Sequence, residues 1–145
     1  MKYEKITKKI LNELGVPIKY SGYNYILCSI DFISNDENII NEVCKILYVD
    51  IAKKYLTSTL CVERNIRYVI DVIWKNKETH KGMIIKIFGQ SYFDKKPTNK
   101  VFLQTMYNYV KNIDMLIFID LLEYKCPFYN EECYVLKQLI NYFLK

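Results

Sequence analysis

Glycine and histidine are scarce in this chain, which has 4 glycines and a single histidine, His80, among its 145 residues. With so few glycines, no Gly-rich loop that would cradle a phosphate stands out. Catalysis through His80 would need a nucleophile beside it and a third group to orient it, and the sequence indicates no such constellation. No paired-carboxylate motif stands out either. The sequence therefore predicts that the protein is not an enzyme and has no cofactor and no small-molecule substrate.

The chain also lacks the cysteine spacings of metal sites. No C-x-x-C pair occurs among its 5 cysteines, so no metal site is expected: Cys28, Cys44, Cys61, Cys126 and Cys133. The charged N-terminus carries no signal peptide, which favours a reducing cytoplasm in which thiols are small buried side chains. Cys61 is an exception because it lies near a predicted helix start, where thiolate is favoured. Chance substitution explains Cys61 better than redox sensing does.

Long apolar runs are missing too. Met115–Ile119 is a short run bounded by Asp114 and Asp120, far too short for a membrane span. Hydrophobic residues make up 51% of the chain and charged residues 26%, as in one compact globular domain. The net charge of +5 favours an anionic partner only mildly, because affinity depends on where the lysines lie.

The most regular stretch is Val49–Trp74, which predicts a short helix, a polar turn and a second helix at about residues 59–75. One apolar stripe of the second helix recurs with a helical period: Val62, Ile66, Val69, Ile70 and Ile73. The other side carries Cys61, Arg64, Asn65, Tyr68 and Asp71, with Glu63 and Arg67 on one flank. Before this helix, Ile51, Ala52 and Tyr55 form a short apolar face, and Thr57–Thr59 offers capping hydroxyls. The pattern is typical of a helix-turn-helix, although a solvated helix in a bundle has the same period.

The rest of the chain also predicts helices, so the expected fold is all-α. Before the central stretch they are Tyr3–Leu14, Tyr23–Ile33 and Glu37–Leu47, the last capped by Asn35-Asp36. After it come Met83–Phe88 and a helix from Thr98 with Val101, Phe102, Thr105, Met106 and Tyr109 inward. We expect a compact multi-helix domain at 1–112. A helical pair, Ile113–Tyr124 and Glu131–Leu144, would form an extension at 113–145 that packs on this domain or at a dimer interface.

Several short motifs carry a family resemblance. Ile10–Pro17 resembles "ILxELGIP", Gly22–Tyr25 resembles "KGYxYL", and Tyr48–Tyr55 resembles "YPDIAKKY". Further on, Val62–Arg67 resembles "VERAIR", Ile87–Gly89 resembles "LFG", and Lys96–Phe102 resembles "KPTNSEF". These motifs occur in the order and with the gaps of one family, the C-terminal DNA-binding domain of the sporulation regulator Spo0A, over about Ile6 to Lys111.

The resemblance implies an all-helical domain that binds short boxes in double-stranded DNA upstream of sporulation genes. By motif match, Glu63, Arg64 and Arg67 would contact bases: Arg can pair with guanine O6 and N7, and Glu can accept from cytosine N4. Further contacts, several of them to the backbone, are expected from Ser58, Thr59, Cys61, Asn65, Tyr68, Lys95, Lys96 and Lys100. Without DNA, Glu63 and Arg67 are also spaced as an i,i+4 ion pair.

The chain departs from the family motif "TTASRVERAIRHA" in the first turns of the predicted recognition helix. Leu60 replaces a serine, Cys61 replaces an arginine and Tyr68 replaces a histidine. Loss of the arginine removes a charge-assisted contact of a kind that contributes about 1–3 kcal/mol of base discrimination. Recognition of the family's own box is therefore in question.

Two functions follow. The first is a sequence-specific transcriptional regulator that lacks its own receiver domain and with it phosphorelay control in cis. The second is an interaction module that does not bind DNA and modulates a full-length paralogous regulator through dimerisation. The retained Glu63, Arg64 and Arg67 favour the first, and the lost arginine and the added extension favour the second. DNA is the expected partner, with a homodimer or pairing with a paralogue as further possibilities.

Overall fold

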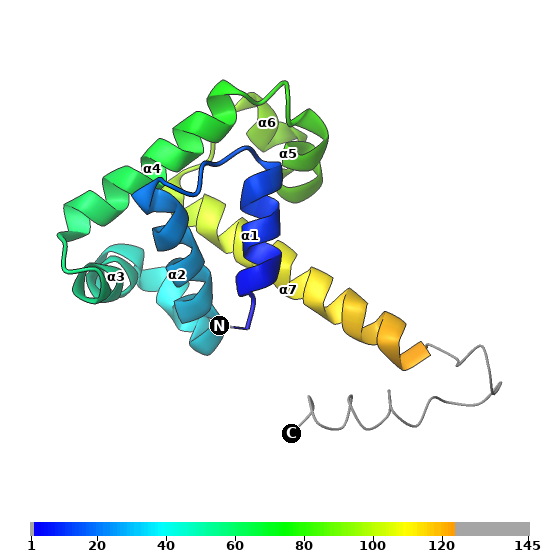
Figure 1. Ribbon diagram of the computed structural model, residues 1–145, viewed down its shortest axis with the longest axis horizontal. Coiled ribbons are helices and arrows are strands. Elements are labelled where there is room, and N and C mark those ends of the chain that lie inside the picture. The colour runs from blue at the N-terminus through cyan, green and yellow to red at the C-terminus, as the bar shows by residue number, and fades with distance from the viewer. Residues whose placement is uncertain (1, 124–145) are drawn as a thin grey trace. The chain divides into compact units, whose positions relative to one another are not determined.

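The protein is an assembly of helices (Figure 1). The computed structural model describes residues 2–123, and within that range it contains no strand. The α-helices are α1 (Glu4–Glu13), α2 (Ser21–Asn35), α3 (Tyr48–Lys54), α4 (Thr59–Lys75), α5 (Lys81–Phe88), α6 (Gln90–Asp94) and α7 (Asn99–Glu123). Two shorter helical segments, η1 (Glu37–Glu42) and η2 (Val43–Leu47), join α2 to α3. The predicted all-α class is confirmed.

The first two predicted helices are confirmed as α1 and α2. α1 ends where Gly15 adopts a φ of 76°, a left-handed conformation that favours glycine. There the N–H of Gly15 donates to the carbonyl of Asn12 and the N–H of Val16 to that of Leu11, the Schellman pattern. The buried residues of α2 include Tyr25, Ile26, Ser29, Ile30 and Ile33.

The helix predicted at Glu37–Leu47 is wrong in type. Asp36 caps the segment, its carboxylate accepting from the Asn38 N–H at 3.0 Å, but the residues that follow form the 3₁₀-helix η1. At Glu42 the backbone leaves the helical region, with φ −121° and ψ 48°, and the π-helical turn η2 begins. Ile40, Val43 and Leu47 are buried as in a regular helix. The apolar spacing fixed which side is buried but not how tightly the backbone winds.

An aromatic cluster holds the C-terminal end of α4 against α5, α6 and α7. The Trp74 ring lies edge-on to Phe88 and Phe102, with centroids 5.2 and 6.3 Å away, and those two rings stack on each other at 5.2 Å. The Trp74 indole N–H donates to the carbonyl of Tyr92 at 2.8 Å. Trp74 is therefore a packing residue, and α6, whose carbonyl it binds, was not predicted from the sequence.

The inward face predicted for α7 is wrong by about one residue. Phe102 and Met106 are buried as expected, but their buried companions are Leu103, Tyr107 and Val110 rather than Val101, Thr105 and Tyr109. Tyr107 turns inward because its hydroxyl donates to Glu37 at 2.7 Å and its ring meets Tyr3 edge-on. Apolar residues occur on all sides of α7, so their periodicity alone does not indicate which side is buried.

The chain divides into two compact units, Met1–Val110 and Lys111–Lys145. The described part of the second unit is helical to Glu123, so the apolar run Met115–Ile119 lies within a helix. Its helix is continuous with α7 rather than a separate element starting at Ile113. The helix predicted at Glu131–Leu144 lies outside the described residues.

We expected the thiols to be buried, but not all of those in the described residues are. Cys28 is buried, and burial raises the pKa of its thiol. Cys44 is exposed in η2 and Cys61 is half-buried, so the prediction was wrong for Cys44. Cys126 and Cys133 lie outside the described residues.

Candidate nucleic-acid interface

α3 and the turn after it set the start of α4. Ile51 and Ala52 of α3 are buried, as predicted. Tyr55, which was predicted to share their apolar face, is exposed and lies edge-on to Tyr25, so that prediction is only partly correct. Leu56 follows with a φ of 52°. The N–H of Leu56 donates to the Lys53 carbonyl and that of Thr57 to the Ala52 carbonyl, a second Schellman pattern. A leucine thus occupies the left-handed position that Gly15 occupies after α1.

α4 begins where the hydroxyls predicted a cap. The Ser58 hydroxyl accepts from the N–H of Cys61 at 3.1 Å, which satisfies one of the free donors of the first turn. The whole predicted apolar stripe is buried: Val62, Ile66, Val69, Ile70 and Ile73. Burial of the stripe fixes the rotation of α4 and hence which side chains stay in water.

α2 crosses α4 very closely, and Gly22 makes this possible. A Cβ on Gly22 would overlap the carbonyl oxygen of Asn65 and lie 2.6 Å from Val69 Cγ2. No larger residue fits without moving a backbone. Gly22, the first residue of the Gly22–Tyr25 motif, is thus required by the packing of α2 on α4.

The exposed side of α4 carries a stripe that we call the reading stripe: Leu60, Glu63, Arg64 and Arg67. These residues are spaced i, i+3, i+4 and i+7, so they share one face. Leu60 is 52% exposed, and Arg64 and Arg67 are exposed as well. Within residues 2–123, Arg64 has no ion-pair partner. An exposed, uncompensated guanidinium on a rigid helix is available to an external acceptor.

The other arginine of the stripe is already paired. Arg67 forms the predicted i,i+4 ion pair with Glu63, and Lys96 reaches across from the segment before α7 to pair with Asp71. All four side chains are partly exposed, so each pair contributes little to stability. The first pair holds Arg67 within the reading stripe, and the second holds Lys96 against Asp71 of α4.

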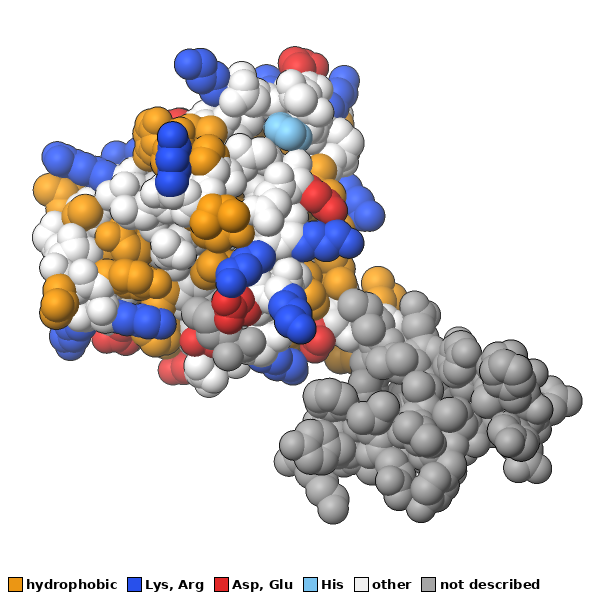
Figure 2. Space-filling model, in the orientation of Figure 1, with side chains coloured by type: hydrophobic (Ala, Val, Ile, Leu, Met, Phe, Trp, Pro, Cys, Tyr) orange, Lys and Arg blue, Asp and Glu red, His pale blue; other side chains and the backbone are white. Residues whose placement is uncertain are grey.

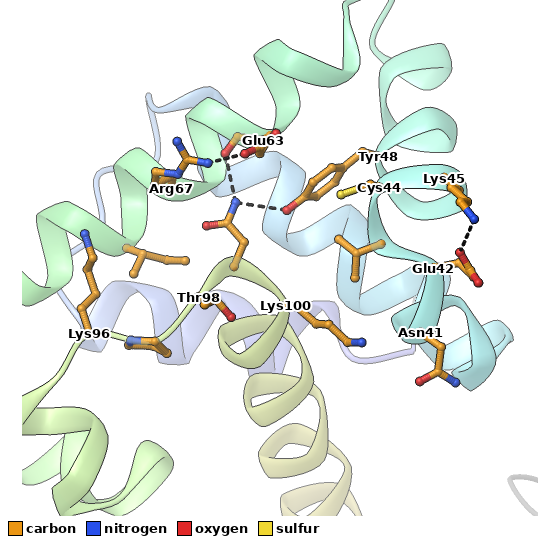
Figure 3. Close-up of a pocket in the computed structure, with 14 residues that line it drawn as sticks. Asn41, Glu42, Cys44, Lys45, Tyr48, Glu63, Arg67, Lys96, Thr98 and Lys100 are labelled. Atoms are coloured by element: carbon orange, nitrogen blue, oxygen red, sulfur yellow. Dashed lines mark hydrogen bonds and ion pairs between the residues drawn. The ribbon is translucent and has the colours of Figure 1, made fainter.

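A groove runs beside this flank of α4 (Figure 3). Its volume is about 610 Å³, and it lies between α4, the η1–η2 segment and the residues leading into α7. Its lining includes the basic residues Lys45, Arg67, Lys96 and Lys100 and the acidic residues Glu42 and Glu63. Cations therefore outnumber carboxylates, which suits a polyanion.

Asn99 connects the walls of this groove, a role that the sequence did not reveal. Its amide nitrogen donates to the Tyr48 hydroxyl and to the backbone carbonyl of Glu63, each at 3.1 Å (Figure 3). Burial raises the pKa of Tyr48, and the bond from Asn99 opposes that rise. In the sequence Asn99 is marked only by the Lys-Pro-Thr-Asn-Lys motif, which does not indicate this role. Asn99 positions the reading stripe relative to α3 and α7.

On the other flank of α4, Cys61, Asn65 and Tyr68 contact other residues of the protein. The Asn65 amide donates to the Cys61 carbonyl at 2.8 Å and to its sulfur at 3.3 Å. Tyr68 lies edge-on to Tyr20 with centroids 5.3 Å apart, and its interaction with the Tyr20 hydroxyl raises the pKa of Tyr68. Tyr68 is nevertheless 51% exposed. DNA contacts from these three residues stay predictions.

The remaining predicted contact residues lie at two places. Ser58 and Thr59 are exposed at the start of α4, and Lys95, Lys96 and Lys100 are exposed around the start of α7. Figure 2 shows hydrophobic side chains on the surface around α3 and the start of α4. Tyr55, Leu56 and Leu60 are large exposed hydrophobics of that end.

An all-helical domain with a short helix, a tight turn and a longer helix that exposes arginines is a type of domain found among DNA-binding transcriptional regulators. Comparison with protein families is specific: the model described as "Sporulation initiation factor Spo0A C terminal" matches residues 7–110. The chain therefore belongs to the family of Spo0A C-terminal domains, as its motifs had indicated. These are DNA-binding effector domains of transcriptional regulators and not enzymes.

Within residues 2–123, no helix combines the length and the hydropathy that a membrane span requires. Nor does the described part of the chain bring together three or more histidine, cysteine, aspartate or glutamate side chains in a way that would hold a metal ion.

Proposed function

We propose that α3 and α4 form a helix-turn-helix and that α4 enters the major groove of double-stranded DNA. Arg64 then contacts a guanine and Glu63 accepts from a cytosine amino group, while Arg67 contacts a base or a phosphate. The observation that carries this proposal is the position of Arg64. It is exposed, lacks an ion-pair partner within the described residues, and lies in the reading stripe of a helix held by a buried face.

The Glu63–Arg67 pair fits this role in the free protein. A carboxylate that holds the guanidinium reduces the side-chain freedom that Arg67 would lose on binding. Because the pair is exposed, breaking or sharing it on DNA costs little. Glu63 also prevents the face from being uniformly cationic, which limits binding to arbitrary sequences.

The groove beside α4 would contact the sugar-phosphate backbone. Lys96 and Lys100 line it, and Lys95 is exposed next to them. Phosphate contacts set the register of the protein on DNA without reading sequence. Each such contact should appear in the salt dependence of binding, with a slope of about −0.9 in log affinity against log salt.

The test is a fluorescence-anisotropy titration of the full chain against a duplex that carries the family's box and a scrambled duplex, at two salt concentrations. The Arg64→Ala/Arg67→Ala variant should lose the sequence preference while its circular dichroism and urea midpoint stay unchanged. The matched control is Lys86→Ala, an exposed cation on α5. If the double variant keeps the preference, the assignment of the reading stripe is wrong.

A second candidate is the interaction module that binds a paralogous regulator. Leu56 is 95% exposed, and Leu60 and Tyr55 are exposed close to it in sequence, an apolar group that a protein partner would cover. In the same titration this function gives no binding to either duplex. Light scattering of the chain alone would then test for a homodimer.

A further inference from the structure

The first turn of α4 has a chemistry that differs from the rest of the reading stripe. Residues 59–62 are Thr-Leu-Cys-Val and carry no formal charge. The Ser58 hydroxyl accepts the capping hydrogen bond from the Cys61 N–H, and the Cys61 sulfur accepts one from the Asn65 amide. Both side chains therefore already have partners within the protein. Thr59 and Leu60 are the exposed side chains of this turn, and Leu60, 52% exposed, is the one at the head of the stripe.

Leu60 lies one helical turn before Glu63 and Arg64 on the same face. If those two residues contact base edges, as proposed above, Leu60 lies over the neighbouring bases. In the major groove the apolar feature of a base edge is the 5-methyl group of thymine. A leucine cannot donate or accept a hydrogen bond, so it discriminates by burying this methyl.

We infer that Leu60 is a specificity-determining residue that selects thymine by contact with its 5-methyl group; this inference rests on the proposed function. A protein partner fits the stripe less well, because Glu63, Arg64 and Arg67 share it. Charged residues are depleted in the cores of protein interfaces. Base pairs, in contrast, present donors, acceptors and a methyl group side by side.

The experiment removes a single methyl group from the DNA. Duplexes bound by the full chain are selected from random sequences, and the tightest is made again with each thymine in turn replaced by deoxyuridine. For the unaltered protein we expect about a four-fold loss of affinity at one thymine, the ratio that follows from burial of one methyl-sized group. Other thymines should show no loss.

Three variants assign the effect to Leu60. Leu60→Ser should bind the thymine and deoxyuridine duplexes equally, and Leu60→Met should keep the four-fold ratio. Leu56→Asn is the matched control because it removes a leucine that is even more exposed but lies outside α4. It should leave the ratio unchanged. Circular dichroism and the urea midpoint of Leu60→Ser confirm that this exposed substitution leaves the fold intact.

Each contrary result is informative. If no thymine is sensitive in the unaltered protein, or if Leu60→Ser shows the same loss, the inference is overturned while DNA binding stands. In the second case another residue contacts the methyl, or the methyl acts through DNA shape. If selection yields no duplex, the proposed function fails and the inference with it, and a protein partner becomes the better explanation of the exposed leucines.

Discussion

The two halves of α4 differ in what holds them. In the C-terminal half, Val69, Ile70, Ile73 and Trp74 are all buried, and the Trp74 indole is held by the rings of Phe88 and Phe102 and by a hydrogen bond. In the N-terminal half, Val62 and Ile66 are buried too, but Leu60, Arg64 and Arg67 are exposed and no aromatic cluster holds them. The buried stripe and the aromatic anchor set the position of the helix, so side chains outside the stripe in this exposed half, such as Leu60 and Cys61, can change without loss of the fold.

Removing the anchor should have the largest effect. Trp74→Ala takes away two edge-on ring contacts and leaves a cavity, and should lower the free energy of unfolding by about 4 kcal/mol. Urea denaturation followed by circular dichroism measures this loss. Leu60→Ala in the exposed half is the control, with an expected change below about 0.5 kcal/mol. Equal losses in both variants would abolish the distinction between the halves.

The crossing of α2 and α4 comes next in size. Gly22→Ala pushes a methyl group into the Asn65 carbonyl and should cost about 3 kcal/mol, because neither backbone has room to move. Gly82→Ala is the matched control. It lies in α5 with nothing within 4 Å of the added Cβ, so better helix propensity should stabilise the protein slightly. If Gly22→Ala has the same urea midpoint as the unaltered protein, the close approach does not exist.

The bridge at Asn99 should matter to both stability and binding. Asn99→Ala loses hydrogen bonds to Tyr48 and to the Glu63 carbonyl, and should lower the free energy of unfolding by about 1–2 kcal/mol. Because the bridge positions the reading stripe, DNA affinity should fall further than in a variant of equal stability. Asn108→Ala, an exposed change on the same helix, is the control for both measurements. Unchanged affinity in Asn99→Ala would limit the bridge to stability.

The smallest predicted effect is a gain. Leu56→Asn should raise the free energy of unfolding by about 1 kcal/mol, because the left-handed conformation penalises leucine and this side chain is 95% exposed. A thermal scan would show the midpoint rising by several degrees. Leu56→Ala keeps a Cβ without the asparagine side chain and should give little or no gain. A lower midpoint for Leu56→Asn would mean that Leu56 makes a stabilising contact.

The sequence revealed the parts of α4 that depend on local patterns. Its apolar period predicted the buried stripe, and the hydroxyls before it predicted the Ser58 cap. The resemblance brought Glu63, Arg64 and Arg67 together as one set of candidates. The spacing of Glu63 and Arg67 also predicted their ion pair.

The features that the sequence missed depend on distant contacts. Nothing local in Asn99 indicates that it joins α3 to α4, and Tyr107 faces inward because of Glu37, far away in the chain. The winding of Glu37–Leu47 depends on one backbone departure at Glu42. Base contacts by the reading stripe stay predictions, because neither pattern nor packing includes the DNA.

The central claim is that the exposed half of α4 contacts DNA while the anchored half does not. The most direct test is an NMR titration of the isotope-labelled full chain with the duplex obtained by selection. We predict that amide signals of residues 59–67 and 96–100 shift, and that the indole signal of Trp74 stays in place. Shifts confined to other surfaces, with residues 59–67 unmoved, would contradict the account.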